Sequence, residues 1–175
     1  MMTRWRRFIG SEGGVSAVEF ALLAPVLLTL MLGSVTLYDA FRTNQIVAKV
    51  SSTIADMVSR KREISRAYVV DMNDFMNQAV PLSNELPALR LTSVSNVNGK
   101  MTIKWSDKVG NVGLISTQTV DLDALPTIAV GDSVIITETY VPFTVMVTGF
   151  GMGSMVFKEI MVNRPRFLKE IPFTS

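Results

Sequence analysis

The sequence predicts an α+β protein in which a long N-terminal transmembrane helix extends into a small exported domain with an antiparallel sheet. Three observations predict this fold. Residues 20–38 form an uncharged apolar run about as long as a helix needs to cross a bilayer. Apolar residues then recur three and four positions apart as far as residue 60, and again over residues 64–79. Finally, Asn98-Gly99 separates two segments of β-forming residues, as in a hairpin.

Composition excludes several classes of function. The 175 residues leave room for one anchor and one modest domain, and a net charge of +2 gives no general basic surface for nucleic acid. The absence of cysteine and histidine excludes disulfides, thiol nucleophiles, zinc sites built on these residues and Ser-His-Asp triads. No spacing of the other reactive residues suggests a catalytic set. We therefore expect no enzyme, cofactor, metal site or small-molecule substrate.

The charges that flank the apolar run predict its orientation. Arg4, Arg6 and Arg7 precede the run, against a single acid, Glu12. By the positive-inside rule the N-terminus stays in the cytoplasm and the remaining chain is exported. A removable secretory signal is disfavoured, because its apolar region usually spans only about 7–15 residues. We therefore expect a single-pass membrane protein.

Two residues of the apolar helix depart from local rules. Glu19 lies at the mouth of the run, where a carboxylate needs a partner or the membrane interface. Pro25 lacks an N–H, so the carbonyl of Ala21 loses its helical partner and we expect a kink. An interfacial acid and a tolerated membrane proline would explain both residues without any further function.

The order of features at the N-terminus resembles that of a known family. A basic start leads to Gly13-Gly14, a run of small residues continues into Glu19-Phe20-Ala21, and Pro25 follows early in the apolar helix. This segment, residues 7–38, resembles the N-terminal segment of TadE-like proteins, which are minor pilins or pseudopilins of the tight-adherence (Tad, Flp) pilus system. It covers roughly the first quarter of the chain.

The resemblance implies processing by a prepilin peptidase. Such enzymes cut on the cytoplasmic side after a glycine, with a glutamate as the fifth residue beyond the cut. A cut between Gly14 and Val15 makes Glu19 the fifth residue of the product. A glycine there allows an extended, accessible backbone. The alternative is that Gly13-Gly14 is only a flexible bend ahead of the helix.

The resemblance also implies a role for Glu19 and Phe20 in recognition or assembly. In type IV-like pilins the equivalent glutamate is thought to neutralise the new N-terminal amine of a neighbouring subunit, which would explain a charge at bilayer depth. Two alternatives stay open. Glu19 could be a snorkelling interfacial acid, or it could matter only for recognition by the peptidase.

The resemblance further implies a pilin-like structural or assembly role in a Tad-type pilus. Residues 1–14 would be a basic cytoplasmic leader, residues 15–60 the TadE-like helix with its span at about 20–38, and residues 61–175 the extracytoplasmic α+β domain. The protein would lie in the bacterial inner membrane with its domain in the periplasm, or enter the pilus. Expected partners are the membrane, the prepilin peptidase, other Tad pilins and inner-membrane assembly proteins, in adhesion or secretion. The alternative is an uncleaved single-span component of a secretion or envelope complex.

The helical pattern continues beyond the apolar run. We expect the first helix to extend to about Arg60, with a break possible near Asp39. The basic run Arg60-Lys61-Arg62 is either a solvated helix end or a contact for anionic lipid or an acidic partner. A second helix over residues 64–79 is expected to end at Pro81.

The β-forming residues predict three to four antiparallel strands. Residues 90–98 and 100–107 flank the Asn-Gly turn, and residues 133–141 and 156–163 follow later. We expect Trp105 to be a core or sheet-face aromatic. With a two-residue loop, the predicted pairs across the hairpin are Val97 with Lys100, Val94 with Ile103, and Thr92 with Trp105.

A second, weaker resemblance lies in the strand region. Residues 137–140, Thr-Glu-Thr-Tyr, and the later Arg164-Pro165-Arg166 both resemble TadE-like sequences. Glu138 could face water, or it could pair with Arg164 or Arg166.

Two loop segments complete the prediction. Asp121 and Asp123 lack the ligand series of a calcium site, so we expect them to be solvated. Residues 143–155 are apolar and glycine-rich but too short for a second span. They are expected to form a flexible loop or a short amphipathic helix.

Overall fold

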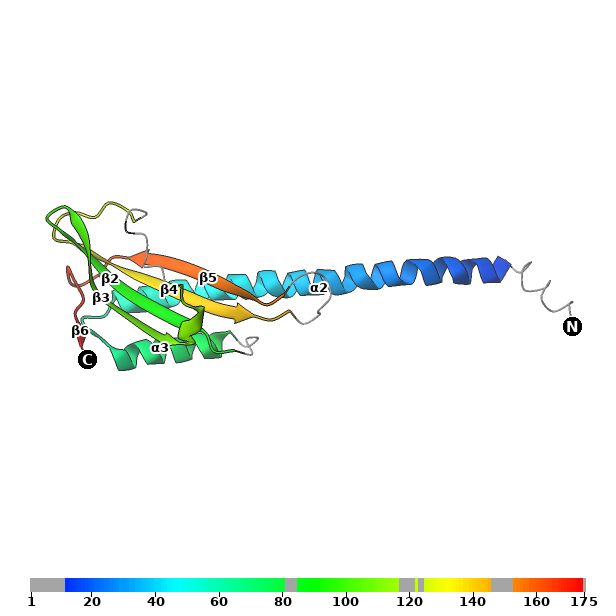
Figure 1. Ribbon diagram of the computed structural model, residues 1–175, viewed down its shortest axis with the longest axis horizontal. Coiled ribbons are helices and arrows are strands. Elements are labelled where there is room, and N and C mark those ends of the chain that lie inside the picture. The colour runs from blue at the N-terminus through cyan, green and yellow to red at the C-terminus, as the bar shows by residue number, and fades with distance from the viewer. Residues whose placement is uncertain (1–11, 81–84, 117–121, 123–124, 146–152, 175) are drawn as a thin grey trace, which may run out of the picture.

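A long helix protrudes from a small α+β domain (Figure 1). The computed structural model describes residues 12–80, 85–116, 122, 125–145 and 153–174. The predicted fold class is confirmed, because an N-terminal apolar helix is followed by a second helix and an antiparallel sheet.

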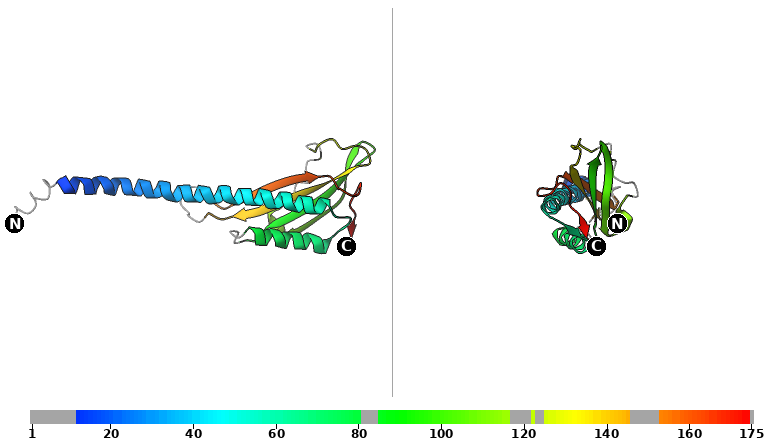
Figure 2. Two further views of the ribbon diagram at one scale, coloured as in Figure 1. Left: turned by 180° about the vertical axis from the view of Figure 1, so that it is seen from behind. Right: turned by 90° about the vertical axis from the view of Figure 1, so that its left-hand side faces the viewer.

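Helix α2 runs from Glu12–Ser59 without interruption. Its N-terminal half stands free of the domain, and its C-terminal half packs on the sheet (Figures 1 and 2). The long helix predicted from the apolar periodicity is therefore confirmed, and the chain does not break at Asp39. Because one helix contains both halves, the domain is fixed at a set distance from the apolar run.

The free half of α2 continues through Pro25. Two hydroxyl side chains on this half bond to backbone carbonyls one turn back. Thr29 Oγ1 donates to the Pro25 carbonyl at 2.7 Å, and Ser34 Oγ donates to the Leu30 carbonyl at 2.8 Å. Such bonds satisfy polar side chains where water is absent. The backbone is α-helical both before and after Pro25, and a kink at this residue stays a prediction.

Helix α3 spans Arg66–Ala79 and follows a two-residue strand, β1, at Ile64–Ser65. The Ser65 hydroxyl caps the helix by accepting a bond from the Tyr68 N–H at 3.3 Å. The predicted second helix is thus confirmed. Pro81, its expected terminator, lies outside the described residues.

The main sheet has four antiparallel strands in the order β3-β2-β4-β5. Their bounds are Ala88–Val97 for β2, Lys100–Gly110 for β3, Ser133–Phe143 for β4 and Met155–Asn163 for β5. A short 3₁₀ turn, η1, follows β3 at Val112–Leu114. All four predicted strands are present, and each runs about one to three residues past its predicted bounds at one end only. The first strand also ends at Val97, just before its predicted C-terminal end.

The hairpin turn forms as predicted. Asn98 and Gly99 both have positive φ, at 52° and 85°, which suits a two-residue loop of the kind that Asn-Gly favours. The two predicted pairs nearest the turn are confirmed: Val97 with Lys100 and Val94 with Ile103.

The third predicted pair is wrong. Thr92 lies opposite Ser106, and Trp105 lies opposite Ser93. A β-bulge next to Ser93 shifts the register by one residue on β3, so that Lys104 is the extra residue. The hydrophobic pattern of β2 and β3 gave no sign of this extra residue.

Both helices cover the same face of the sheet. The C-terminal half of α2 lies over β4 and β5, and α3 lies over β2 and β3 (Figure 2). Trp105 packs against this core, and its indole donates to the Ile171 carbonyl at 2.8 Å, which confirms its predicted role. The buried core consists of Val47, Val50, Ile54, Val58, Ile64, Val69, Met72, Met76, Val80, Leu89, Leu91, Val109, Ile135, Val141 and Ile171.

The C-terminal segment returns to the end of α2. The Arg166 N–H donates to the Ser59 carbonyl at 2.8 Å, so it satisfies a carbonyl in the last turn of the helix. Strand β6, at Phe173–Thr174, then pairs in parallel with β1. These contacts hold the end of the chain at the side of the domain farthest from the free helix (Figure 1).

Candidate functional site

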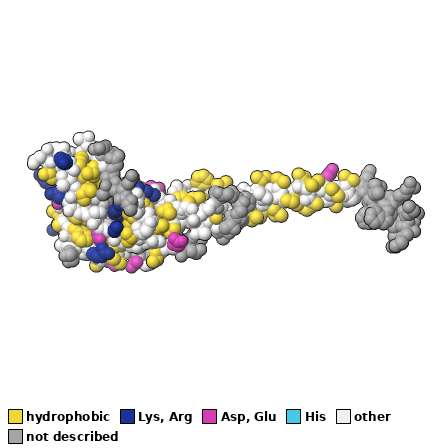
Figure 3. Space-filling model, viewed as in Figure 1, with side chains coloured by type: hydrophobic (Ala, Val, Ile, Leu, Met, Phe, Trp, Pro, Cys, Tyr) yellow, Lys and Arg dark blue, Asp and Glu magenta, His cyan; other side chains and the backbone are white. Residues whose placement is uncertain are grey.

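The free half of α2 exposes an unusual amount of apolar surface. Large apolar side chains point outward on all sides of it, including Phe20 at 69% exposure and Leu22 at 71%. In Figure 3 hydrophobic side chains run along the protruding helix, whereas the basic side chains in view gather over the domain. A soluble protein rarely exposes a continuous apolar surface of this size. By length and composition this helix can cross a membrane, which fits a single-pass membrane protein.

All five residues predicted as sites lie on this free half: Gly14, Val15, Glu19, Phe20 and Pro25. Val15 and Glu19 are four positions apart and therefore share one face of the helix. Their side chains are exposed. The structure thus brings the predicted cleavage position and the predicted recognition acid together on one surface.

The Gly14–Val15 bond lies inside the first turn of α2, because the helix begins at Glu12. The bond is therefore helical, whereas the sequence suggested an extended backbone or a bend. A helix end of this kind frays readily, and each glycine costs about 1 kcal/mol relative to alanine in a helix. Opening the first turn to a protease is therefore inexpensive.

Glu19 is an exposed carboxylate on an otherwise apolar helix. None of the ion pairs formed within the described ranges includes it. The side chain is therefore available on the surface of the helix that the domain leaves uncovered.

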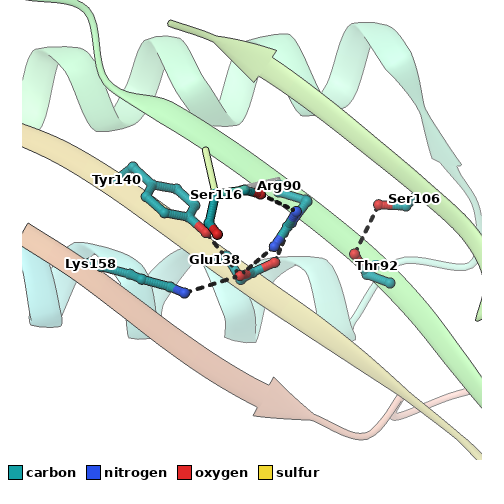
Figure 4. Close-up of polar contacts among 7 residues, drawn as sticks. All are labelled: Arg90, Thr92, Ser106, Ser116, Glu138, Tyr140 and Lys158. Atoms are coloured by element: carbon teal, nitrogen blue, oxygen red, sulfur yellow. Dashed lines mark hydrogen bonds and ion pairs between the residues drawn. The ribbon is translucent and has the colours of Figure 1, made fainter. Parts of the chain in front are cut away.

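A second polar feature is buried in the sheet. Glu138, on β4, is only 1% exposed and points to the face that the helices do not cover (Figure 4). Arg90 of β2 lies directly opposite it in register. The guanidinium donates from Nη2 to Oε1 at 2.8 Å and from Nε to Oε2, a two-pronged contact.

Two further side chains complete this cluster. The Tyr140 hydroxyl donates to Glu138 Oε1 at 3.0 Å, and the Lys158 ammonium lies 3.7 Å from the same oxygen. Arg90 Nη1 also donates to the Ser116 carbonyl at 3.2 Å, so the segment after η1 folds over the cluster. Figure 4 shows these groups converging on Glu138 from three neighbouring strands.

The environment sets the ionisation of the cluster. Burial, together with the nearby Glu138 carboxylate, raises the pKa of Tyr140 to about 12. The hydrogen bonds to Glu138 raise the pKa of Arg90 above its usual value, against the opposing effect of burial. The phenol therefore stays neutral and the guanidinium stays charged at physiological pH. Both carboxylate oxygens are engaged, so the cluster joins strands and is not arranged as a general base.

The structure contradicts the partners suggested for Glu138 by the sequence. Arg164 lies 4.0 Å from Asp132, and Arg166 pairs with Asp56 on α2. Glu138 also does not face water. Sequence reasoning missed Arg90, although one signal was available: Arg90 is the lone charge near the start of an otherwise uncharged strand, and Glu138 is the lone charge in its own strand.

The comparison with known families identifies the long helix. A family model described as TadE-like protein matches residues 14–56. This segment is TadE-like. The match begins at Gly14 and covers the free half of α2 together with most of the half that packs on the sheet. The resemblance predicted from the N-terminal residues is confirmed there. No curated protein and no solved structure matches the chain.

The TadE-like match indicates a protein that is associated with the Tad pilus, which is a structural assembly. The apolar N-terminal helix of this chain fits that indication. The β-strands and the Glu138 cluster lie outside the matched range. Their resemblance to TadE-like sequences therefore stays a prediction.

The first two residues of the basic run after the TadE-like helix, Arg60 and Lys61, are engaged within the domain. Arg60 pairs with Asp56 at 2.6 Å, and the Lys61 ammonium lies 4.4 Å from the centre of the Tyr68 ring. The run lies about 35 Å along α2 from the free apolar half, at 1.5 Å per residue. This distance disfavours the predicted alternative in which these residues contact anionic lipid.

Two shallow hollows lie on the domain surface, but neither contains a catalytic arrangement. One, of about 380 Å³, is lined by residues 164–169 with Asp132 and Ser133, and the other, of about 430 Å³, lies beside Tyr68 and Asp71. Within the described residues, no three acidic side chains come close enough to bind a metal ion. Asp121 and Asp123, which were expected to be solvated, lie outside the described residues.

Proposed function

We propose that this chain is a minor pilin or pseudopilin of a Tad-type pilus, anchored in the inner membrane by α2 with its domain in the periplasm. The observation that carries the proposal is the coincidence of the TadE-like match with a helix whose free half exposes apolar side chains on every side. Its mechanism is packing and not chemistry. Apolar helices of several subunits exchange lipid contacts for contacts with one another during assembly.

Processing between Gly14 and Val15 would prepare this helix for assembly. The cut would place a new amino group at Val15, one helical turn before Glu19. Because Glu19 is exposed on the free helix, it can reach the amino group of a neighbouring subunit. A pair of opposite charges in an apolar setting would then set the register between two helices.

The N-terminus of the mature protein tests this proposal. The full chain is expressed in its own host, and the N-terminus is determined by mass spectrometry of the membrane fraction. We expect a start at Val15 in the wild type and at Met1 when the prepilin peptidase is deleted. Glu19→Ala should also leave the start at Met1, whereas Asp39→Ala, an acid farther along the same helix, should not.

The opposite outcome is equally clear. A start at Met1 in the wild type, in cells where the peptidase processes its own major pilin, would contradict the pilin proposal. If the Glu19→Ala variant is still cut after Gly14, the processing proposal stands. Glu19 would then act in assembly or lie at the membrane interface, and the peptidase would not need it.

The second candidate is an uncleaved single-span component of a secretion or envelope complex. One observation favours it: the Gly14–Val15 bond lies in the first helical turn of α2, and this turn, although inexpensive to open, must open before a protease can cut the bond. The same mass measurement separates the two candidates.

Shearing of pili from cells distinguishes a minor pilin, which enters the filament, from a pseudopilin, which does not. Pili are sheared from cells, and the chain is detected by immunoblotting in the sheared and the membrane fractions. A minor pilin appears in both fractions. A pseudopilin stays with the membrane, where other Tad pilins and inner-membrane assembly proteins would be its partners.

A further inference from the structure

The packing of α2 on the domain begins inside the run that the sequence assigned to the membrane. Thr36 is only 1% exposed, although the predicted span extends to Tyr38. Thr43 and Val47, at 2% and 1%, follow on the same face of the helix. From Thr36 onward, therefore, protein and not lipid covers this side of α2.

The opposite side of the helix carries a different set of residues at the same level. Tyr38 and Phe41 are 64% and 67% exposed, and Arg42 beside them is exposed as well. Aromatic and basic side chains are the types that gather where a bilayer meets water. Their position at the level where the domain begins indicates that this level is a membrane interface.

The stretch before Thr36 has the length of a bilayer core. Residues 15–35 lie on the free half, where every large apolar side chain is more than a third exposed. At 1.5 Å per residue, this stretch measures about 30 Å, which matches the hydrocarbon thickness of a bilayer. The run 20–38, by contrast, would place the buried Thr36 contact inside the hydrocarbon.

We propose that the bilayer surrounds residues 15–35 and that Tyr38, Phe41 and Arg42 bind its periplasmic interface, so that the domain sits directly against the membrane. This inference rests on the membrane anchoring in the proposed function and adds the surface that contacts lipid. The periplasmic end of the membrane span therefore lies before Thr36, and not at Tyr38 as the apolar run predicted. This placement also puts Glu19 about one turn inside the hydrocarbon, where a carboxylate requires a partner.

The chain is well suited to a test because it contains no cysteine. Each introduced thiol is therefore the only one. Val18→Cys, Leu27→Cys, Tyr38→Cys and Gln45→Cys replace exposed side chains, so none disturbs the domain. The full chain in its native membranes is treated with N-ethylmaleimide, which reaches both faces of a bilayer. The remaining free thiol is then counted by a mass tag after solubilisation.

We expect Tyr38→Cys to react about as fast as the exterior control, Gln45→Cys. Val18→Cys and Leu27→Cys should react at least roughly tenfold more slowly than Gln45→Cys, because a thiol in hydrocarbon does not form the reactive thiolate. Slow reaction at Tyr38 or fast reaction at Val18 would overturn the inferred boundary while Leu27 stays protected. Fast reaction at Leu27 would instead show that no bilayer surrounds the helix, and would contradict the anchoring itself.

Discussion

Arg90 and Glu138 lie 48 residues apart in the sequence and directly opposite each other on neighbouring strands, where the guanidinium donates hydrogen bonds to both carboxylate oxygens. Their side chains are 11% and 1% exposed. A pair this deeply buried is stable only while both partners remain, because an unpaired buried charge is costly.

The first prediction concerns this pair. Arg90→Met should lower the free energy of unfolding by about 3–5 kcal/mol, because Glu138 keeps only the half-exposed Lys158 as a counter-charge. Arg90→Met combined with Glu138→Leu should recover most of that loss. The measurement is urea unfolding of the full chain in detergent micelles, followed by circular dichroism.

A matched control uses an exposed ion pair. Lys104 lies 3.9 Å from Glu170 at the surface, and Lys104→Met should cost less than about 1 kcal/mol. If Arg90→Met costs no more than Lys104→Met, the Arg90–Glu138 pair does not hold the strands together.

The second prediction concerns alkaline pH. Tyr140 has a pKa of about 12 in the folded protein, above the usual value of about 10. A raised pKa in an acid means that the folded state holds its proton more tightly, so this stabilisation is present below about pH 10 and is lost towards pH 12. By pH 12 we expect the loss in the free energy of unfolding to be roughly 2 kcal/mol, because one pKa unit corresponds to about 1.4 kcal/mol. Unfolding measured at several pH values in this window should show a steeper decline for the wild type than for Tyr140→Phe, and parallel declines would disprove the coupling.

The third prediction compares two glycines of β3 and its turn. Gly99 and Gly110 both have positive φ, at 85° and 83°. A Cβ on Gly99 would meet nothing within 4 Å, whereas one on Gly110 would lie 2.1 Å from the Pro87 carbonyl oxygen. Gly99→Ala should therefore lower the free energy of unfolding by only about 1–2 kcal/mol, the backbone strain of a residue with a side chain at this positive φ. Gly110→Ala should cost about 1–3 kcal/mol more, because backbone must move. Equal melting temperatures for the two variants would show that Gly110 is not in close contact with this carbonyl.

The fourth prediction concerns the contact between helix and sheet. Ser51 of α2 and Thr139 of β4 are fully buried, and their hydroxyl oxygens lie 2.5 Å apart. Ser51→Val adds volume where helix and strand meet and leaves the Thr139 hydroxyl without this partner, so it should cost about 2–4 kcal/mol. Ser52→Val, with the same change of helix propensity at an exposed position, should cost less than about 0.5 kcal/mol. Thermal unfolding of both variants in detergent checks the difference, and a similar cost for the two would argue against close packing at Ser51.

Local patterns were sufficient for most elements of the fold. The 3.6-residue period predicted both helices, and Asn98-Gly99 predicted the hairpin and its two nearest pairs, because each depends on residues close in sequence. The bulge beside Ser93 escaped prediction. One extra residue on β3 leaves the apolar alternation readable on either side of it, so the shift appears only when both strands are in place.

The N-terminal sequence by itself determined the apolar helix and its TadE-like character, and it supplied the residues proposed for processing and recognition: Gly14, Val15, Glu19 and Phe20. All of these follow from composition and order along one continuous segment. The tertiary structure alone decided that Glu138 pairs with Arg90 and that the domain covers α2 from Thr36 onward. These are contacts between distant segments. A sequence pattern shows that a charge or a helix face needs a partner, but only the folded chain brings a particular partner to it.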